Sequence, residues 1–212
     1  MEIKNQLKKL KEISSKNLLI GLTGGIGCGK STVLRFFKEM GAYTVSSDEK
    51  VKEILTNKKN CDKILIRYPQ VSNPDGFINR KKLAKLIFKN KKARQVIECV
   101  IHPLVVDGII SELCRLEGKI IVMEVPLLFE TWLKDAVEIS ISVYSDLDKK
   151  ILRLRKRGMD LRDIKLRMKS QIEDKIKVNV ADVVISNNGS IKELKNKTKE
   201  IYESFYKLLN RR

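Results

Sequence analysis

Residues 18–31 have the sequence LLIGLTGGIGCGKS, in which an apolar segment runs directly into a glycine-rich turn. Gly24, Gly29, Lys30 and Ser31 occupy the fixed positions of the G-x-x-x-x-G-K-[ST] phosphate-binding loop. In such a loop the glycines let successive backbone N–H groups point at the phosphates, and the following helix directs its positive end at the same charge. The stretch therefore predicts a buried strand, a phosphate loop and a helix.

The predicted loop supplies the candidate nucleotide-binding residues. Lys30 is expected to reach the β- and γ-phosphates, and the Ser31 hydroxyl is the candidate ligand for Mg²⁺. Apolar residues at helical spacing follow the loop up to Gly41, as the motif requires. A glycine-rich turn followed by a chance Lys-Ser is the alternative, which this context disfavours. The residues expected to hold ATP are Gly25, Ile26, Gly27, Cys28, Gly29, Lys30, Ser31 and Thr32.

Length and composition are typical of one globular α/β domain. The chain has 212 residues, of which 42% are hydrophobic and 33% are charged, so it can bury a sizeable core. No apolar run approaches the ~18 residues of a membrane span, and no signal-peptide pattern is found. The four cysteines are widely spaced, which disfavours structural zinc and a disulfide framework. We therefore expect a cytoplasmic protein with no membrane partner.

The formal net charge of +18 requires an explanation. A positive field concentrates anionic substrates such as nucleotides, or it marks a nucleic-acid surface. The lysine runs of this chain lack the interleaved aromatic residues of a nucleic-acid platform. We therefore favour a lysine-rich surface with a basic active-site cleft, and we expect no nucleic-acid partner.

Cys28 lies inside the predicted loop and close to a helix N-terminus. The pKa of a thiol tends to be lowered at such a position, which would make Cys28 sensitive to oxidation. The alternative is that Cys28 only fills a small space. We favour the space-filling role and keep sensitivity to oxidation as a hypothesis.

Residues 1–17 precede the first predicted strand. They carry apolar residues among lysines, a pattern typical of a short amphipathic helix. The acidic residues and the absence of arginine argue against an organelle transit peptide. We interpret this segment as an optional surface extension.

Two carboxylates follow predicted strands. Asp48 comes soon after the segment 42–46, and Glu124 ends the buried-strand run 119–123. In open α/β sheets the chemistry lies beyond the carboxyl ends of the strands, so both residues are aimed at the crevice of Lys30. Asp48 could orient or deprotonate an acceptor hydroxyl, or it could only cap the next helix. Glu124 is a candidate for holding Mg²⁺ through water or for supporting the loop.

The pattern from about residue 52 to residue 118 is helical and basic. Asn79 is expected to cap one helix, a second helix is expected to end at His102-Pro103, and a third to follow. A helical insertion between strands suggests a subdomain that binds the acceptor. His102 is the only histidine; a buried, hydrogen-bonded structural role is favoured over proton transfer.

The last third of the chain predicts strands at 137–143 and 183–185, the first with one face less buried. Between them, Asp146 and Asp160 are expected to cap two helices. The basic junction of these helices could form a lid that folds arginines over a triphosphate. A solvated cationic helix end is the alternative. We favour function for Arg157.

These motifs occur together and in this order in one known family. The chain resembles the dephospho-CoA kinases, which catalyse the last step of coenzyme A synthesis. The resemblance covers residues 18 to about 208. It is carried by GLTGGIGCGKST at 21–32, Ser47-Asp48, Arg80, His102-Pro103, VPLLFE at 125–130, Arg153 and Arg157 ahead of Gln171, Ala181-Asp182, and residues 187–190.

The resemblance implies a P-loop NTPase-type three-layer α/β fold with a parallel sheet. It divides residues 18–208 into a core, a helical CoA-binding insertion at about 51–117 and a lid at about 146–179. The core comprises residues 18–50, 118–145 and 180–208. The resemblance further implies Mg²⁺-dependent transfer of the γ-phosphoryl group of ATP to the ribose 3′-hydroxyl of dephospho-CoA. We expect a monomer or a weak homo-oligomer.

Roles for single residues follow from the same resemblance. Asp48 matches the acidic residue that acts on the acceptor hydroxyl, Lys30 holds the phosphates, and Arg157 matches a lid arginine. Arg80 and His102, with Asp48, fall in the acceptor-binding region.

The chain departs from the family pattern at three positions. Ser46 stands where many members carry a first aspartate, so only the second carboxylate remains. Glu124 is longer by one methylene than the usual aspartate, and Cys28 replaces a common serine. The lost first aspartate puts support of the remaining carboxylate in doubt.

Two other functions remain open from the residues alone. One is a different small P-loop kinase that acts on a nucleoside, nucleotide or other small acceptor. The other is a regulatory GTPase or an ATP-dependent nucleic-acid-binding protein, suggested by the loop and the charge. The chain lacks an N-K-x-D guanine motif after a later strand, which disfavours the GTPase.

Overall fold

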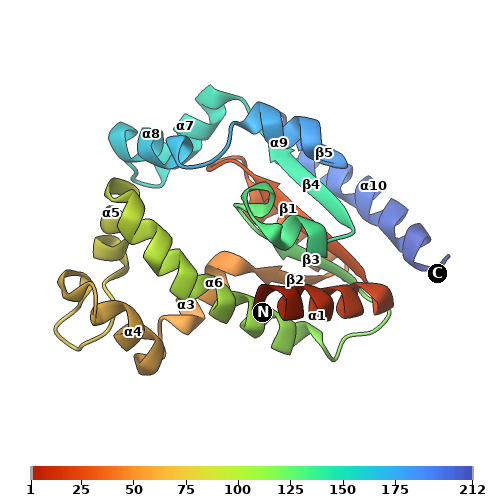
Figure 1. The fold of residues 1–212 in the computed structure, drawn as a ribbon. Coiled ribbons are helices and arrows are strands. Elements are labelled where there is room, and N and C mark those ends of the chain that lie inside the picture. Colours follow the sequence, from red (N-terminus) through yellow and green to blue (C-terminus); the bar gives the residue numbers. More distant parts are fainter. Residues whose placement is uncertain (1, 212) are drawn as a thin grey trace.

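Five parallel strands form the central sheet of the structure, a computed structural model that describes residues 2–211 (Figure 1). The strands are β1 (Leu18–Gly24), β2 (Tyr43–Ser46), β3 (Ile120–Glu124), β4 (Ile139–Tyr144) and β5 (Val183–Ser186). They lie in the spatial order β2-β3-β1-β4-β5. The parallel α/β fold expected from the sequence is confirmed, and the strand that leads into the phosphate loop lies in the middle of the sheet.

Helices cover both faces of this sheet and give the fold three layers. Alternate residues of a strand point to opposite faces, and the buried residues of β1 accordingly divide between two hydrophobic clusters. One cluster packs against α2 and α10, and the other against α1 and α6. The helices are α1 (Glu2–Lys16), α2 (Lys30–Glu39), α3 (Ser47–Ile54), α4 (Lys58–Leu65), η1 (Pro69–Val71), α5 (Arg80–Lys89), α6 (Lys91–Leu113), η2 (Leu128–Glu130), η3 (Trp132–Ala136), α7 (Leu147–Lys156), α8 (Leu161–Lys169), α9 (Asp174–Val180) and α10 (Ile191–Leu209).

The prediction that β4 has one less buried face is wrong. Ser140 and Ser142, the polar members of its alternating pattern, are both buried. Ser140 is satisfied there because its hydroxyl donates a hydrogen bond of 2.6 Å to the carboxylate of Asp182. A parallel sheet covered by helices on both sides buries both faces, and alternation of side-chain polarity does not reveal this.

The N-terminal segment is an integral part of the core, so the prediction of an optional surface extension is wrong. Leu10 of α1 is fully buried and Ile13 is 6% exposed, and both belong to the cluster that includes α6. α1 packs against α6 and also contacts η3 and β1 (Figure 1). The buried stripe of α1 is narrow, with Gln6, Leu10 and Ile13 as its buried residues, so this packing is hard to predict from the sequence.

The predicted break at His102-Pro103 is also wrong, since α6 is one helix of 23 residues with Pro103 inside it. A proline removes one hydrogen bond from a helix and usually ends or kinks it. Here Ile101 and Val105, on either side of the proline, are both buried in the same cluster. Burial of this continuous apolar face offsets the lost bond.

The predicted helix starts are confirmed where a polar side chain caps the helix. Asn79 accepts a bond of 3.0 Å from the backbone N–H of Lys82 at the start of α5. Asp160 and Ser190 cap α8 and α10 in the same way. Asp146 is the N-cap residue of α7, but its side chain forms no capping bond, so the expected cap is wrong there. α8 ends at Lys169, and α9 follows as a separate short helix. Among residues 2–211, none of the helices has the length and apolarity that crossing a membrane demands.

Candidate active site

The phosphate loop connects the end of β1 to the start of α2, in the middle of the sheet edge. Gly24, Gly27 and Gly29 have φ angles of 142°, 80° and 97°, a region that side chains rarely adopt. A Cβ atom on Gly24 would run into the carbonyl oxygen of Val143, and one on Gly29 into the side-chain amide of Asn187. The loop therefore requires glycine for its backbone angles and for its close neighbours.

Lys30 is the first residue of α2, and its side chain folds back over the loop. Its Nζ donates hydrogen bonds to the carbonyl oxygens of Gly24 at 2.9 Å and Gly25 at 3.1 Å. Burial lowers the pKa of Lys30, while the nearby carboxylates of Glu124 and Asp48 oppose that shift. A loop that holds a cation beside its backbone N–H groups is suited to an anion such as a phosphate chain.

Glu124 lies between the phosphate loop strand and the strand that leads to Asp48. In the parallel register Glu124 pairs with Ser46 on one side and with Leu22 on the other. The side chain is 5% exposed, and burial raises the pKa of its carboxyl, against the charge of Lys30. This buried carboxylate stands next to the loop, at the strand end where the sequence predicted it.

Asp48 lies in the first turn of α3 and is exposed. The N-cap position of this helix belongs to Ser46, so the alternative that Asp48 caps the helix is wrong. The charges of Asp48 and Lys30 act on each other, because Asp48 is one of the groups that raise the pKa of Lys30. Asp48, Glu124 and Lys30 thus share one edge of the sheet.

Asn187 and Arg153 hold the phosphate loop through its carbonyl oxygens. Reasoning from single sequence positions did not identify this role. Asn187, at the end of β5, donates a hydrogen bond of 2.7 Å to the carbonyl oxygen of Cys28. Arg153 of α7 donates to the carbonyl oxygens of Asn187 at 2.8 Å and Gly27 at 3.4 Å. Both residues belong to the family pattern, but their contacts join segments more than 120 residues apart, which local sequence patterns do not reveal.

Arg157, the arginine favoured for the lid, does not share the contacts of Arg153 with the phosphate loop. It is the exposed C-cap residue of α7, and within residues 2–211 it forms no hydrogen bond or ion pair with the loop. The two arginines differ because Arg153 is one turn earlier on the helix and points back to the loop. Because the Arg157 side chain is exposed and forms no hydrogen bond or ion pair within residues 2–211, its charge remains available to a ligand.

The connection between α8 and α9 is hydrogen-bonded to the phosphate loop. The side-chain oxygen of Gln171 accepts a hydrogen bond of 3.1 Å from the backbone N–H of Ile26. Lys150 of α7 and Asp174 of α9 form an ion pair next to Gly25. The helices that follow β4 therefore lie directly over the phosphate loop.

The same helices reach across to the helical segment between β2 and β3. The guanidinium of Arg167 on α8 lies over the ring of Phe88 on α5, 5.0 Å from its centroid, where the two helices approach one another (Figure 1). Arg94 of α6 donates a bond of 3.3 Å to the carbonyl oxygen of Ser170. These contacts connect α8 and the turn after it with the helical segment between β2 and β3.

The segment VPLLFE at 125–130 connects β3 to these helices. Glu130 accepts a hydrogen bond of 3.1 Å from the backbone N–H of Ile172 and forms an ion pair with Lys177 of α9, also at 3.1 Å. Lys177 is fully buried, and it donates a second bond of 2.8 Å to the carbonyl oxygen of Pro126. A buried lysine needs such partners, so this pair fixes α9 against the end of β3.

His102 and Arg80 lie on the helical segment and are both exposed. The prediction of a buried, hydrogen-bonded His102 is therefore wrong. Its surroundings still lower the pKa of the imidazole by partial burial, and Glu98, one turn earlier on α6, opposes that shift. Within residues 2–211 neither His102 nor Arg80 forms a hydrogen bond or an ion pair with the phosphate loop.

The side chain of Cys28 is fully buried in the cluster between the sheet and α2. Burial raises the pKa of its thiol, and the charge of Asp174 adds to the shift. The expected lowering of this pKa is wrong, because the side chain points into the core and away from the polar side of the loop. The space-filling role fits this position.

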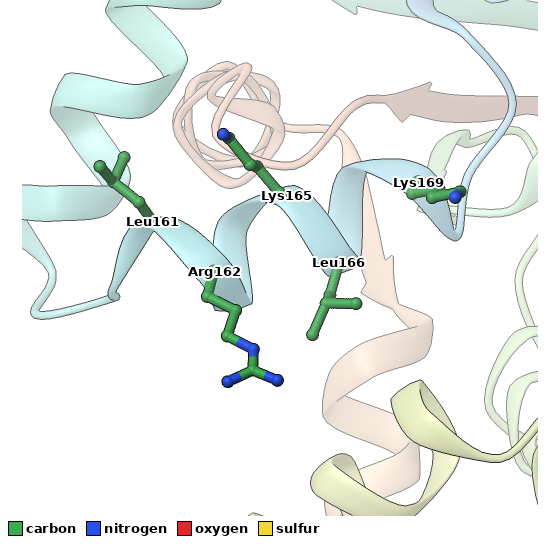
Figure 2. A pocket seen from close by; sticks show the side chains of 5 residues that line it. All are labelled: Leu161, Arg162, Lys165, Leu166 and Lys169. Atoms are coloured by element: carbon green, nitrogen blue, oxygen red, sulfur yellow. The ribbon is translucent and has the colours of Figure 1, made fainter.

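A hollow of about 410 Å³ lies beside α8 (Figure 2). Figure 2 shows the side chains of Arg162 and Leu166 on one side of the helix and that of Lys165 on the other. The hollow combines cationic and apolar side chains outside the loop contacts described above. It is lined by Leu161, Arg162, Lys165, Leu166 and Lys169.

A phosphate loop at the central strand of a parallel sheet, with carboxylates at the neighbouring strand ends, defines the class of P-loop kinases. The family model described as dephospho-CoA kinase matches residues 18–193. The chain belongs to the dephospho-CoA kinase family. This family catalyses the ATP-dependent phosphorylation of dephospho-CoA, the last step of coenzyme A biosynthesis.

Relatives and solved structures agree with this assignment. A dephospho-CoA kinase of Carboxydothermus hydrogenoformans is 37% identical over 179 residues, which are 82% of this chain and 87% of that protein. The solved dephospho-CoA kinase of Campylobacter jejuni has a TM-score of 0.67 and 26% identity, and it covers 90% of this chain and 98% of its own. A Thermus thermophilus crystal structure has a TM-score of 0.78 and 28% identity, with coverage of 89% and 97%.

Proposed function

We propose that this kinase transfers the γ-phosphoryl group of ATP to the ribose 3′-hydroxyl of dephospho-CoA, with Asp48 acting on that hydroxyl. The observation that supports this most is the parallel register of β2, β3 and β1. Because Ser46, Glu124 and Leu22 lie side by side, the turn that carries Asp48 begins at the same edge as the phosphate loop. An acceptor hydroxyl placed between Asp48 and Lys30 would face the terminal phosphate.

The phosphate loop would bind the triphosphate chain of ATP through the backbone N–H groups of residues 25–32. Lys30 would leave the carbonyl oxygens of Gly24 and Gly25 and donate to the phosphates, which carry full charges. Asn187 and Arg153 would keep the loop in shape during this exchange. Positioning and charge neutralisation of this kind supply most of the catalysis of phosphoryl transfer.

The residues present also fit Mg²⁺. The exposed hydroxyl of Ser31 and the carboxylate of Glu124 are oxygen donors at the same edge, as Mg²⁺ prefers. Within residues 2–211 no three His, Cys, Asp or Glu side chains gather into a metal-binding group. Ser31 directly and Glu124 through water would therefore hold the ion together with phosphate oxygens. When bound, the ion supplies charge that neutralises the transferring group.

The helical segment at about 51–117 would bind dephospho-CoA, and residues 146–179 would act as a lid. Arg80 and His102 are exposed on the first segment and are available to the acceptor. Arg157 is exposed on the second, and its side chain forms no hydrogen bond or ion pair within residues 2–211. Contacts such as Arg94 with Ser170 already connect the two segments across the loop. Closure of a lid over the substrates would exclude water from the reaction.

The role of Asp48 is tested by the Asp48→Asn variant, which keeps the shape of the side chain and removes its charge. We expect kcat to fall by ~10²-fold or more, the contribution of a general base, while ATP binding is nearly kept. Glu49→Gln is the matched control, since Glu49 is the adjacent exposed carboxylate on the same helix. Near wild-type turnover of Asp48→Asn would contradict the role.

The acceptor itself is tested with purified protein, ATP and Mg²⁺, by comparing dephospho-CoA with nucleosides and nucleoside monophosphates. Phosphorylation of dephospho-CoA alone, at the 3′-hydroxyl, supports the proposal, and preference for another acceptor contradicts it. A mobility-shift assay at physiological salt tests the nucleic-acid alternative suggested by the charge of +18. Because both substrates are small and water-soluble, we propose that the enzyme acts in the cytoplasm. For its oligomeric state we propose a monomer or a weak homo-oligomer.

A further inference from the structure

α1 lies outside the residues that the family model matches, yet it is joined to α6 by more than apolar contact. The family model begins at residue 18, and α1 comprises Glu2–Lys16. Leu10 and Ile13 bury the middle of α1 in the core, and the side chain of Gln6 is buried as well, at 3% exposure. Burying an amide costs free energy unless the amide is hydrogen-bonded, so the partners of Gln6 show which part of the core α1 is fixed to.

Gln6 donates two hydrogen bonds to one turn of α6. Its Nε2 atom donates to the carbonyl oxygen of Pro103 at 3.1 Å and to the carboxylate of Asp107 at 3.0 Å. The amide nitrogen of glutamine carries two hydrogens, and both are used here. Gln6 therefore holds the turn that begins at Pro103.

This turn is the weak point of α6. Pro103 has no N–H, so the carbonyl of Cys99 lacks its helical partner and the helix can bend there. On the C-terminal side, Glu112 accepts a bond of 2.9 Å from the hydroxyl of Tyr43 and fixes the helix to the sheet. On the N-terminal side, Arg94 reaches the carbonyl oxygen of Ser170 between α8 and α9. Both halves of α6 contribute to the core, but only the half before Pro103 also contacts the lid segment, through Arg94, and only the half after it is bonded to β2, through Glu112.

We infer that Gln6 is a positioning residue for the acceptor, because it fixes the proline-containing turn of α6 and thereby the direction of the N-terminal half of that helix. This inference rests on the proposed assignment of residues 51–117 to the acceptor. His102 directly precedes Pro103, so a change of bend at the proline moves His102 and Arg94 relative to the phosphate loop. The loop itself is held by hydrogen bonds from Asn187 and Arg153, and these bonds do not involve α1, so we expect ATP binding to be kept.

Gln6→Glu is the test variant, since it keeps the shape of the side chain, removes both donor hydrogens and places a charge against Asp107. Asn5→Asp is the matched control, because it makes the same amide-to-carboxylate change at the neighbouring exposed position of α1. Gln6→Glu/Asp107→Asn restores a donor to the pair and should recover part of the loss. Gln6→Met, which lacks donors and charge, replaces the test variant if the charge lowers the melting temperature.

We expect the KM for dephospho-CoA to rise about five- to tenfold in Gln6→Glu, the factor that one net hydrogen bond can supply. The KM for ATP and kcat at saturating acceptor should stay unchanged, and Asn5→Asp should behave as the wild type. Hydrogen exchange of peptides that cover residues 95–104 should speed up in Gln6→Glu, which a defect confined to α1 would not cause.

Two results would overturn the inference: an unchanged acceptor KM in Gln6→Glu and Gln6→Met, or an equal rise of the KM for both substrates. These results leave the proposed function untouched, because the wild-type enzyme would still phosphorylate dephospho-CoA. A different pattern would be unchanged acceptor KM in Arg80→Ala and His102→Ala, together with faster exchange at residues 95–104 in Gln6→Glu. In that case the assignment of the acceptor segment fails, while the role of Gln6 in fixing the turn of α6 is kept.

Discussion

Asn187 donates a hydrogen bond from its side-chain amide to the carbonyl oxygen of Cys28, 2.7 Å away, and so joins the end of the last strand to the phosphate loop. The same amide occupies the space that a Cβ on Gly29 would need. Position 29 must therefore be glycine for the Asn187 amide to reach the carbonyl oxygen of Cys28. The shape of the phosphate loop depends on a residue 159 positions further along the chain.

Asn187→Ala removes the donor and leaves a buried carbonyl oxygen without its partner. We expect the free energy of unfolding to fall by about 1–3 kcal/mol, the cost of such a group, and the KM for ATP to rise. Urea unfolding and steady-state kinetics measure the two effects. Asn188→Ala is the control, because the side chain of Asn188 bonds to Ser145 and Asp146 and not to an atom of the phosphate loop. A normal ATP KM in Asn187→Ala would show that the loop keeps its shape without this bond.

Arg153 and Arg157 lie one turn apart, and their alanine variants should separate structure from catalysis. Arg153→Ala should lower stability and raise the KM for ATP, because Arg153 bonds to Gly27, Ser145 and Asn187. Arg157→Ala should leave the unfolding free energy unchanged and lower kcat at least about tenfold, as expected for a cation that stabilises the transferring phosphoryl group. Thermal unfolding and kcat, measured on both variants, decide between these roles. Equal effects of the two substitutions would contradict the assignment.

The thiol of Cys28 should react slowly. Burial raises its pKa, so the neutral thiol prevails at pH 7, and the thiolate is the reactive form. Cys99 and Cys114 are exposed and should be alkylated first. Mass spectrometry after brief treatment with iodoacetamide measures the order of labelling. Peroxide should inactivate the wild type and Cys28→Ser equally, and protection by the substitution would revive the hypothesis of a redox-sensitive loop.

His102 should titrate below the ordinary pKa of about 6.5, because its surroundings partly desolvate the ring. The folded pKa is lower than the unfolded one, so the unfolded chain binds the proton more readily as the pH falls below about 6.5. Stability contributed by this group is therefore present at higher pH and is lost as the pH decreases through the window between the two pKa values. NMR titration of the only histidine measures the midpoint, and His102→Gln should show a smaller loss of stability across that window. A midpoint at or above the ordinary value would contradict the prediction.

The phosphate loop and the carboxylates at the strand ends could be predicted because each depends on local order in the sequence. A strand, a glycine-rich turn and a helix follow one another within 18–39, and parallel strands bring their carboxyl ends to one edge. Glu124 was located in this way from a single buried-strand run. The same reasoning identified the caps at Asn79 and Asp160, whose partners are three residues away.

The remaining features depend on contacts between distant segments. The buried position of the Cys28 thiol follows from the side to which its residue points, which a motif does not specify. α6 continues through Pro103 because the core buries residues on both sides of it, and α1 joins the core through only a few apolar positions and Gln6. Local propensity is overridden in each case by burial that only the folded chain creates.

The order of the strands in the sheet has a consequence for synthesis of the protein. β1 is made early, but its partners β3 and β4 begin at residues 120 and 139, and the amide that shapes the loop comes at residue 187. Pairing over such separations makes folding slow, because long stretches of chain must be closed before any contact rewards them. A nascent chain that still lacks its last strand therefore cannot form a finished nucleotide pocket, and ATP can stabilise this protein only after nearly the whole chain has left the ribosome.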